Sequence, residues 1–445
     1  MFFLGYIMVP YVAFISLRSV GIKVSTISVP SFFFIYYVLG AYAGILILYY
    51  GLDFHSILRG ATDNKIIVKM FILSSGTLMM LTCGAVLASR SKLKRHTGNS
   101  RKFTTRPLNK FSILFLFLLV LISAIVIVDY VRSIGVVPIL MAIGGQAGEA
   151  VNARVTLLTS NFQSTYSMGM YSLFARMILP LVSYILFAEY LQYHKNSIKL
   201  LLLFAVALSI VGSVIETAKG PLVFYALGLL ITNLIVGGNR VYIKNIIVGL
   251  IIVLIITSII MPLFMGSKLS IYETFIYMIN RTMLGNLVPG YITIEMFDDG
   301  EFLLGASFPN PRGVFPYKQY LLAQEIWIKM MRPTYASNQL YTAPPVLWAE
   351  LYANFGYFSF FLALFIGAFI AWLQIALNKI PFSSTKVGLS AWMTLYFMGI
   401  SIKGVGAYMW DYYFFVVLLI AISIMLFQGR GKFYYSIGGN EAKIK

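Results

Sequence analysis

The chain of 445 residues has one cysteine, three histidines and only 15 acidic residues. The cysteine, Cys83, lies inside an apolar run, which excludes a disulfide framework and a thiolate metal site and predicts a small buried side chain. The histidines, His55, His96 and His194, form no His-x-x-x-His pair, and neither Gly-x-Ser-x-Gly nor a phosphate-binding glycine motif before a lysine occurs. The sequence therefore predicts no metal site, no cofactor and no nucleotide hydrolysis, so the energy for a reaction must come with the substrate.

Charged residues are also scarce, at 11% of the chain, whereas 59% of the residues are hydrophobic. A soluble protein of this length lacks both that balance and repeated apolar runs of about twenty residues. Barrel strands would be about ten residues long with alternating polarity, and no such alternation occurs. We therefore predict an all-α polytopic integral membrane protein that forms one membrane domain over residues 1–445.

Eleven apolar runs follow one another along the chain, and each is a candidate transmembrane helix. They cover residues 2–17, 29–51, 66–89, 111–131, 171–189, 200–215, 221–237, 245–265, 347–377, 387–402 and 412–427. The first run is short for a span, so it is tilted, interfacial or preceded by residues that this sequence does not include.

The linker 90–110 carries eight lysines and arginines and no acid, which places it in the cytoplasm by the positive-inside rule. Counting outward from it, the cytoplasmic segments are 18–28, 90–110, 190–199, 238–244, 378–386 and the tail from 428. Together they hold 20 of the 34 basic residues and one acid, Glu441. This topology puts the C-terminus inside and the N-terminus outside. It accounts for most of the net charge of +19 without a nucleic-acid partner.

Two outer segments are long, residues 132–170 and residues 266–346. The second carries charges of both signs and the proline cluster 308–316. A loop of this length is rarely structureless, and we expect short helices on the outer surface, for example over 271–297. Loops of this kind hold chemistry on a rigid scaffold, and we expect this one to handle an anionic, lipid-linked glycan. The chain has no visible internal repeat, which weakens a transporter interpretation.

Five outer-side cations are candidates for binding a diphosphate: Arg154, Arg176, Lys219, Arg281 and Arg312. An arginine fork binds two phosphate oxygens at once and keeps its charge. Fixed cations would also stabilise the charge that builds on a leaving diphosphate. The alternative for each loop cation is a solvated side chain or a contact with a lipid headgroup. Arg176 differs because it lies within a span, where a charge is costly and tends to face a cavity.

Glycosyl transfer needs a base that takes the proton of the attacking hydroxyl. Glu350, at the start of the span after the long loop, is the main candidate, and Glu216, Asp411 and Glu273 follow. The alternative for Glu350 is a structural pair with a neighbouring cation. Aromatic residues on the outer side, including Tyr317, Trp348 and Trp410, are typical either of sugar stacking or of an interfacial aromatic belt.

Three short elements resemble the bacterial oligosaccharide repeat-unit polymerases, the Wzy-type O-antigen polymerases. Phe308-Pro-Asn-Pro-Arg-Gly-Val-Phe-Pro-Tyr-Lys318 is similar to the Pro-Arg … Pro-x-Lys stretch of their large outer loop, and Glu350-Leu-Tyr-Ala-Asn-Phe-Gly356 to their Glu-x-Tyr-x-Asn-Phe-Gly element. Glu216-Thr-Ala-Lys-Gly220 resembles a short turn with a basic residue after Ser or Thr. The resemblance covers residues 130–380, and Ser359 stands where the family often has glycine.

The resemblance implies a metal-independent transferase of the GT-C type, with eleven or twelve transmembrane helices, in the bacterial inner membrane. It would move a growing polymer from undecaprenyl diphosphate onto the next lipid-linked repeat unit at the periplasmic face. Arg176, Lys219, Arg281, Arg312 and Arg154 would bind the diphosphates, and the catalytic residues would come from Glu350, Arg281 and Glu216.

Implied partners are the lipid-linked donor and acceptor glycans, membrane lipid, and a chain-length regulator and flippase of the same pathway. Two other functions stay open: a lipid-linked oligosaccharide flippase or similar transporter, and an O-antigen ligase. A ligase typically relies on a histidine in the large loop, and residues 266–346 contain none.

Overall fold

The computed structural model describes residues 2–52, 63–90, 107–144, 165–216, 219–238, 283–331, 342–429, 436–437 and 440–441, and a few single residues between these ranges. Almost all of the regular structure in the described residues is helical, as the composition predicts. The exception is an antiparallel pair of two-residue strands near the C-terminus, β1 (Ser436–Ile437) and β2 (Asn440–Glu441). Ten of the eleven apolar runs form helices, and the run at 245–265 lies almost entirely outside the described residues.

Six helical segments in the described ranges are long and apolar enough to cross a membrane, as expected of a polytopic membrane protein. They are Val29–Tyr49, Asn64–Ser89, Lys110–Ile134, Met168–Tyr193, Asn196–Val214 and Leu347–Lys379. Three shorter apolar helices, Phe3–Ser19, Gly220–Val236 and Tyr412–Gln428, coincide with three further runs.

The chain forms two compact units that interleave in sequence. Unit 1 comprises residues 1–99, 271–376 and 394–411, and unit 2 comprises residues 100–270, 377–393 and 412–445. The second long outer segment therefore belongs almost wholly to unit 1, and the first one belongs to unit 2.

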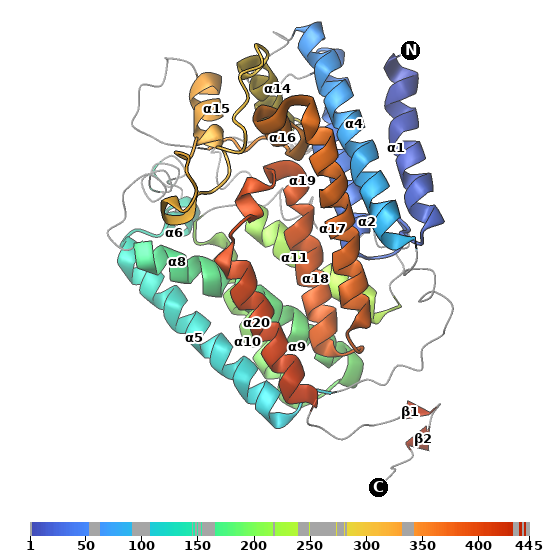
Figure 1. Cartoon of the computed structure of the whole chain (residues 1–445). Coiled ribbons are helices and arrows are strands. Elements are labelled where there is room, and N and C mark those ends of the chain that lie inside the picture. The colour runs from blue at the N-terminus through green and yellow to red at the C-terminus, as the bar shows by residue number, and fades with distance from the viewer. Residues whose placement is uncertain are drawn as a thin grey trace. The chain divides into compact units, whose positions relative to one another are not determined.

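Unit 1 is built mainly from helices that the first and last thirds of the chain contribute (Figure 1). These are α1 (Phe2–Ser19), α2 (Val29–Tyr37), the π-helical turn η1 (Val38–Tyr42), α3 (Gly44–Tyr49), α4 (Asn64–Ser89), α14 (Leu287–Met296), the 3-10 turn η4 (Pro311–Gly313), α15 (Leu322–Met331), α16 (Leu347–Phe355), the 3-10 turn η6 (Gly356–Phe358), most of α17 (Ser359–Lys379), α19 (Ile400–Lys403) and the 3-10 turn η7 (Gly406–Tyr408).

Large aromatic side chains fill the core of unit 1. Trp348 on α16 is fully buried, and its indole N–H donates to the carbonyl of Ala41 at 2.8 Å. Tyr37 is also fully buried, and its hydroxyl donates to the carbonyl of Ser74 on α4 at 2.9 Å. Each buried polar tip thus has a partner, as an apolar interior requires.

Helices α4 and α17 approach so closely that their contact needs glycine. A Cβ atom on Gly84 would lie 1.8 Å from the carbonyl oxygen of Leu364, and one on Gly367 would lie 1.9 Å from that of Leu81. Small residues that let two backbones meet are a common way to join helices in a membrane, where apolar burial between helices gives little driving force.

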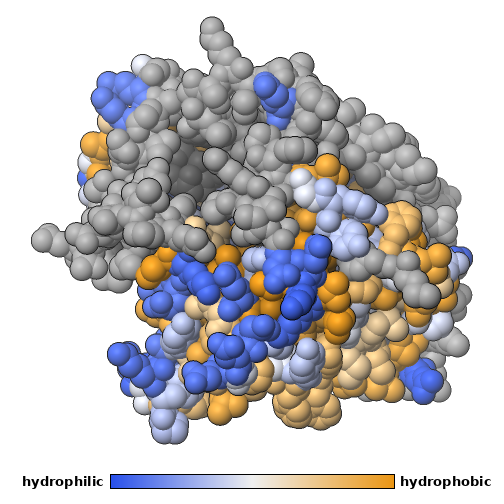
Figure 2. All heavy atoms as spheres, turned by 90° about the horizontal axis from the view of Figure 1, so that it is seen from above, coloured by the Kyte–Doolittle hydropathy of each residue, from blue (hydrophilic) through white to orange (hydrophobic). Residues whose placement is uncertain are grey.

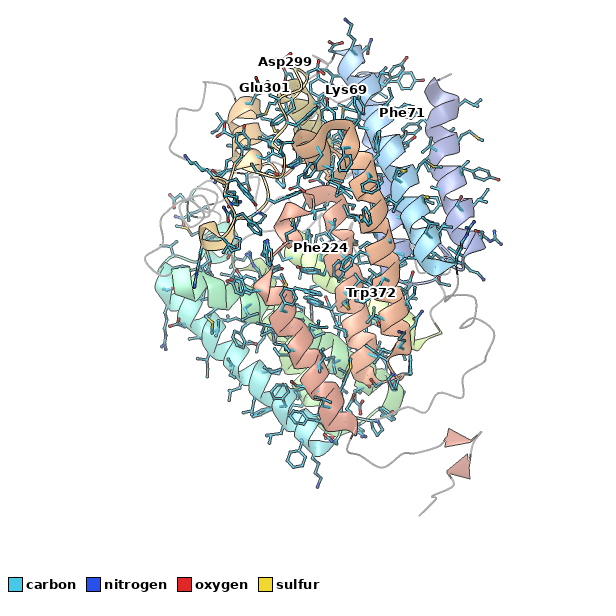
Figure 3. The ribbon with its side chains drawn as sticks, in the orientation of Figure 1. Lys69, Phe71, Phe224, Asp299, Glu301 and Trp372 are labelled. Carbon is cyan, nitrogen blue, oxygen red and sulfur yellow. The ribbon has the colours of Figure 1, made fainter. Side chains whose placement is uncertain are left out.

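The outer loop and the basic linker lie at opposite ends of α4. At its start, the Asp63 N–H donates to the Tyr291 hydroxyl of α14, and Lys69 forms an ion pair with Asp298 at 2.5 Å. Figure 3 shows Lys69 at the same end of unit 1 as Asp299 and Glu301. The linker begins after Ser89, at the other end of a helix of 26 residues, which is about 39 Å long. The sidedness of the two segments stays a prediction.

Unit 2 is a bundle around α9 (Leu179–Tyr193), which is almost entirely buried. Its other helices are α5 (Lys110–Ile134), α6 (Pro138–Ile143), α8 (Thr165–Leu173), the π-helical turn η3 (Phe174–Ile178), α10 (Asn196–Val214), α11 (Lys219–Val236) and α20 (Tyr412–Gly429). Helix α18 (Ser384–Met398) starts in unit 2 and ends in unit 1.

A buried carboxylate ties several helix ends of unit 2 together. Glu189 accepts the Leu108 N–H at 3.1 Å and the Ser384 hydroxyl at 2.6 Å, and the Lys195 ammonium is 3.7 Å away. At the same end, the amide of Asn109 donates to the carbonyl of Phe427 on α20. One end of unit 2 therefore contains residues of three predicted cytoplasmic connections and the end of α20.

Two details differ from the sequence predictions. Cys83 is exposed on the outside of α4 rather than buried, because an apolar run of this length carries no marker of which face turns inward. Helix α14, in the stretch where we expected a surface helix, is internal: its residues from Leu287 to Ile294 are buried, and the helix packs on α4, α15 and α16. Seen from above, the described hydrophilic residues lie in several groups with hydrophobic residues between and beside them (Figure 2).

Candidate functional site

Unit 1 contains a pocket of about 240 Å³ between the outer loop, α16 and the segment that joins α19 to η7. Its polar lining comes from Ser307, Gln319, Tyr320, Gln324, Thr342, Glu350 and Lys403, and prolines and backbone supply much of the rest. Mostly apolar walls with a few converging polar groups are typical of a ligand site. The volume is below the range of about 300–1,000 Å³ for drug-sized ligands, so it fits one ring of a larger molecule.

Asn354, fully buried on α16, fixes one wall of the pocket. Its Oδ1 accepts the N–H of Gly305 at 3.1 Å and that of Ser307 at 3.4 Å. Its Nδ2 donates to the Ser307 hydroxyl at 2.7 Å and to the carbonyl of Glu350 at 2.8 Å. Both ends of the amide are satisfied, so the network holds the loop rigidly on α16.

Backbone hydrogen bonds fix the other wall. The Tyr320 N–H donates to the carbonyl of Ala306, and the Ala343 N–H donates to that of Ala323 on α15, both at 2.8 Å. Partial burial, followed by the nearby Glu325 carboxylate, raises the pKa of the Tyr320 phenol above its ordinary value. Tyr320 therefore presents a neutral hydroxyl that can donate a hydrogen bond in the pocket.

Glu350 lies in the first turn of α16, is 7% exposed, and is held by the backbone of the α19–η7 segment. Its Oε2 accepts the N–H of Val405 at 2.5 Å and that of Gly406 at 3.1 Å, and its Oε1 is 3.3 Å from the latter. Burial of the side chain disfavours negative charge on Glu350, and the helix N-terminus and the backbone N–H groups oppose this effect. Oε1 receives only the longest contact, so it keeps lone pairs for a ligand hydroxyl.

Gly404 allows the segment between α19 and η7 to approach the Glu350 carboxylate closely. It has a φ of +76°, and a Cβ atom there would lie 2.3 Å from Oε2 of Glu350. Lys403, directly before it, is the last residue of α19 and lines the same pocket. An acidic residue and a basic residue from two different elements therefore line the pocket.

Arg312 lies on the part of the loop that follows the pocket wall, in the turn η4. Its side chain is exposed, and its φ of +56° is unusual for a residue with a Cβ atom. Asn310 holds this turn: its Nδ2 donates to the carbonyls of Phe315 and Tyr317, and its Oδ1 accepts the Phe315 N–H at 2.9 Å. The guanidinium is thus carried on an ordered turn rather than on a loose strand of the loop.

Unit 2 contains a second polar cluster, inside its helices. Arg176, on the π-helical turn η3, forms an ion pair with Glu216, which follows α10. Glu216 also accepts the Tyr130 hydroxyl at 2.9 Å, and the Tyr130 ring stacks on Tyr171 at 3.9 Å. The guanidinium lies 5.3 Å from the centre of the Tyr171 ring. Among the described residues, Nε of Arg176 has no hydrogen-bond partner.

The structure brings some of the predicted site residues together and leaves others apart. Glu350 lines the pocket in unit 1, Arg312 lies on the same loop, and Arg176 and Glu216 pair in unit 2. Lys219 is the first residue of α11 instead of a residue of the preceding turn. Arg154 and Arg281 lie outside the described residues.

Sequence reasoning missed Lys403, Asn354 and Tyr130. Lys403 directly follows the apolar run 387–402 and precedes two glycines, Gly404 and Gly406, and this combination was the available signal. No pattern in the sequence distinguishes Tyr130 from the other tyrosines at the ends of apolar runs. Among the described residues, no group of three or more His, Cys, Asp or Glu side chains could hold a metal ion.

Comparison with known proteins gave no match: no family model, no curated protein and no solved structure is significantly similar to this chain. The function must therefore be argued from the pocket and from the residues around it.

Proposed function

We propose that the chain is a glycosyltransferase that polymerises oligosaccharide repeat units linked to undecaprenyl diphosphate, at the periplasmic face of a bacterial inner membrane. The observation that carries the proposal is the pocket in unit 1. The two elements that resemble the Wzy-type polymerases, residues 308–318 and 350–356, each contribute a residue to its lining, Pro309 and Glu350. Lys403 lines the same pocket and adds a basic residue.

The proposed reaction breaks the bond between the anomeric carbon of the donor glycan and its diphosphate oxygen. A hydroxyl of the acceptor repeat unit forms the new glycosidic bond and passes its proton to Glu350. Undecaprenyl diphosphate leaves with the bonding electrons, and nearby cations stabilise its charge. Cleavage of the bond between the donor sugar and its diphosphate supplies the energy, so the reaction needs no nucleotide.

The cations divide into three groups in this proposal. Lys403 and Arg312 belong to unit 1, one inside the pocket and one on the exposed turn beyond it. We propose three further diphosphate ligands from the sequence alone: Arg281, Arg154 and Lys219. One guanidinium nitrogen of Arg176 already donates to Glu216. Arg176 would therefore bind the diphosphate only through its remaining N–H donors.

Glu350 is a better base than Glu216 in this scheme. The carboxylate of Glu216 is occupied by an arginine and a tyrosine within the helices of unit 2. The carboxylate of Glu350 is held by backbone N–H groups but also lines the pocket. A GT-C architecture with eleven or twelve transmembrane helices is part of the same proposal.

Deletion of the gene in the natural host tests the function. A polymerase mutant should display surface glycan one repeat long, whereas a flippase mutant loses the glycan and a ligase mutant leaves polymer on the lipid carrier. The purified protein should also join lipid-linked repeat units without an added energy source. Failure of the purified protein to extend them, in a membrane mimic that keeps it folded, would overturn the proposal.

A further inference from the structure

Three aromatic side chains of unit 1 form an exposed group that we call the aromatic shelf: Phe315, Tyr317 and Trp410. The rings of Phe315 and Tyr317 are nearly parallel, 12° apart, with their centres separated by 5.9 Å. Trp410 comes from a distant part of the chain, and its ring centre is 6.1 Å from that of Phe315. Trp410 is 56% exposed and Phe315 is 36% exposed, so ring surface is open to a ligand.

Hydrogen bonds hold the loop side of the shelf in place. Asn310 makes three hydrogen bonds to the backbone of Phe315 and Tyr317, and the Tyr317 hydroxyl is 3.3 Å from the carbonyl of Phe308. Trp410 has a φ of +58°, a left-handed conformation that costs a residue with a Cβ atom free energy. Strained residues of this kind persist where surrounding contacts fix them, and they cluster at functional sites.

The shelf continues the wall of the pocket along the chain. Pro309 lines the pocket and directly precedes Asn310, and Ala407 lines it three residues before Trp410. Two of the chain segments that line the pocket therefore also carry the shelf, within a few residues of their lining positions.

We propose that the aromatic shelf is a carbohydrate subsite that stacks a sugar ring of the glycan whose neighbouring ring occupies the pocket. The inference rests on the proposed function, since it assigns the substrate of the same site. Sugar rings have an apolar face of C–H groups that packs on an aromatic face, and the pocket supplies hydrogen bonds for the next ring. A tryptophan in an interfacial belt needs only the correct depth in the membrane. It does not need a second chain segment pinned against it.

The test measures binding of single repeat-unit oligosaccharides, released by mild acid from the lipid carrier of the deletion strain. Titration calorimetry with the full-length protein in detergent gives the Kd. We expect Trp410→Ala and Phe315→Ala each to weaken binding about tenfold, and Trp410→Phe to retain most of it. Trp372→Ala is the matched control, because Trp372 is 55% exposed on α17 of the same unit but lies away from the loop (Figure 3).

The outcomes separate the shelf from the function. Equal affinities of wild type and both alanine variants, or no binding by wild type, would overturn the shelf. So would a loss of association with lipid vesicles in Trp410→Ala without a change in glycan affinity, because that result identifies a belt residue. If the deletion strain gives single repeats and these affinities are equal, the carbohydrate subsite is rejected and the polymerase function stands. If the deletion strain keeps its full-length glycan, the polymerase function fails whatever the affinities are.

Discussion

Arg176 and Glu216, which are 40 residues apart in sequence, form an ion pair inside the helices of unit 2. The Glu216 side chain is 7% exposed and that of Arg176 is 30% exposed, so water screens the pair only in part. The sequence had offered them as separate candidates, a phosphate ligand and a base. Because the two side chains form a pair, a substitution of either one also changes the environment of the other.

Arg176→Met should destabilise the protein, because it leaves the Glu216 carboxylate buried without a counter-charge. Removal of one partner from a buried pair costs about 3–5 kcal/mol, and the partial exposure of Arg176 puts the expected loss at the lower end. Thermal unfolding in detergent should show a lower Tm for Arg176→Met and for Glu216→Gln.

The double variant Arg176→Met/Glu216→Gln separates structure from function. If the pair is structural, the double variant should be more stable than the sum of the single losses predicts, and chain extension should return with stability. Strictly additive losses would show that the two residues do not depend on each other. Recovery of the Tm without recovery of extension would assign one of the two a direct part in the reaction.

Glu350→Gln should reduce chain extension by at least about 100-fold, the lower range for loss of a general base. Glu301→Gln is the matched control, because Glu301 is an exposed glutamate of the loop before α16 and does not line the pocket. Extension is measured as the glycan ladder in cells and as the rate with purified protein at equal amounts. The carboxylate also holds Val405 and Gly406, so a loss of activity that merely follows a loss of folded protein would contradict its role as the base.

Gly404→Ala should be more harmful than Gly300→Ala. Both glycines have positive φ, +76° and +85°, so each substitution strains the backbone, and the ψ of 178° puts Gly404 in a region that is essentially confined to glycine. At Gly404 the new Cβ atom would also lie 2.3 Å from the Glu350 carboxylate, whereas nothing lies within 4 Å of a Cβ at Gly300. We expect a larger fall in Tm for Gly404→Ala than for Gly300→Ala, and a loss of extension for Gly404→Ala only. Similar effects of both substitutions would mean that the contact with Glu350 contributes little.

Much of the helical architecture could be predicted, because a long apolar run has few alternatives to a helix in a membrane. The same runs did not reveal which face of a helix is buried, so the exposure of Cys83 was missed. Helix α14 lies outside these runs, in the segment 266–346, where we expected a surface helix and the structure has a buried one. Hydrophobic periodicity identifies an inner face only when the other face is polar, and lipid removes that contrast.

The site could be predicted only in part, for a different reason. Glu350 was identified because a carboxylate at the start of a span is unusual, and it does line the pocket. Its contact with Val405 spans 55 residues, and that of Arg176 with Glu216 spans 40 residues. Spacing along a single chain does not give such distances, so the sequence named residues but not their partners.

A cysteine-accessibility experiment tests the sidedness on which the proposed function depends. Cys83 is exposed, so it is first replaced in Cys83→Ala, and single cysteines are then introduced as Arg312→Cys on the exposed turn η4 and Lys92→Cys in the basic linker. In spheroplasts, a membrane-impermeant maleimide should label the cysteine at 312, and it should label the one at 92 only after lysis. The parent Cys83→Ala protein should stay unlabelled.

The geometry of α4 makes this result decisive. The loop contacts the start of α4 through Asp63 and Lys69, and the linker begins after Ser89 at its other end. A helix of about 39 Å spans a hydrocarbon core of about 30 Å, so the two positions must be labelled from opposite sides. Labelling of both positions from outside would contradict α4 as a span. Reversed labelling would place the pocket in the cytoplasm, where a periplasmic polymerase cannot act.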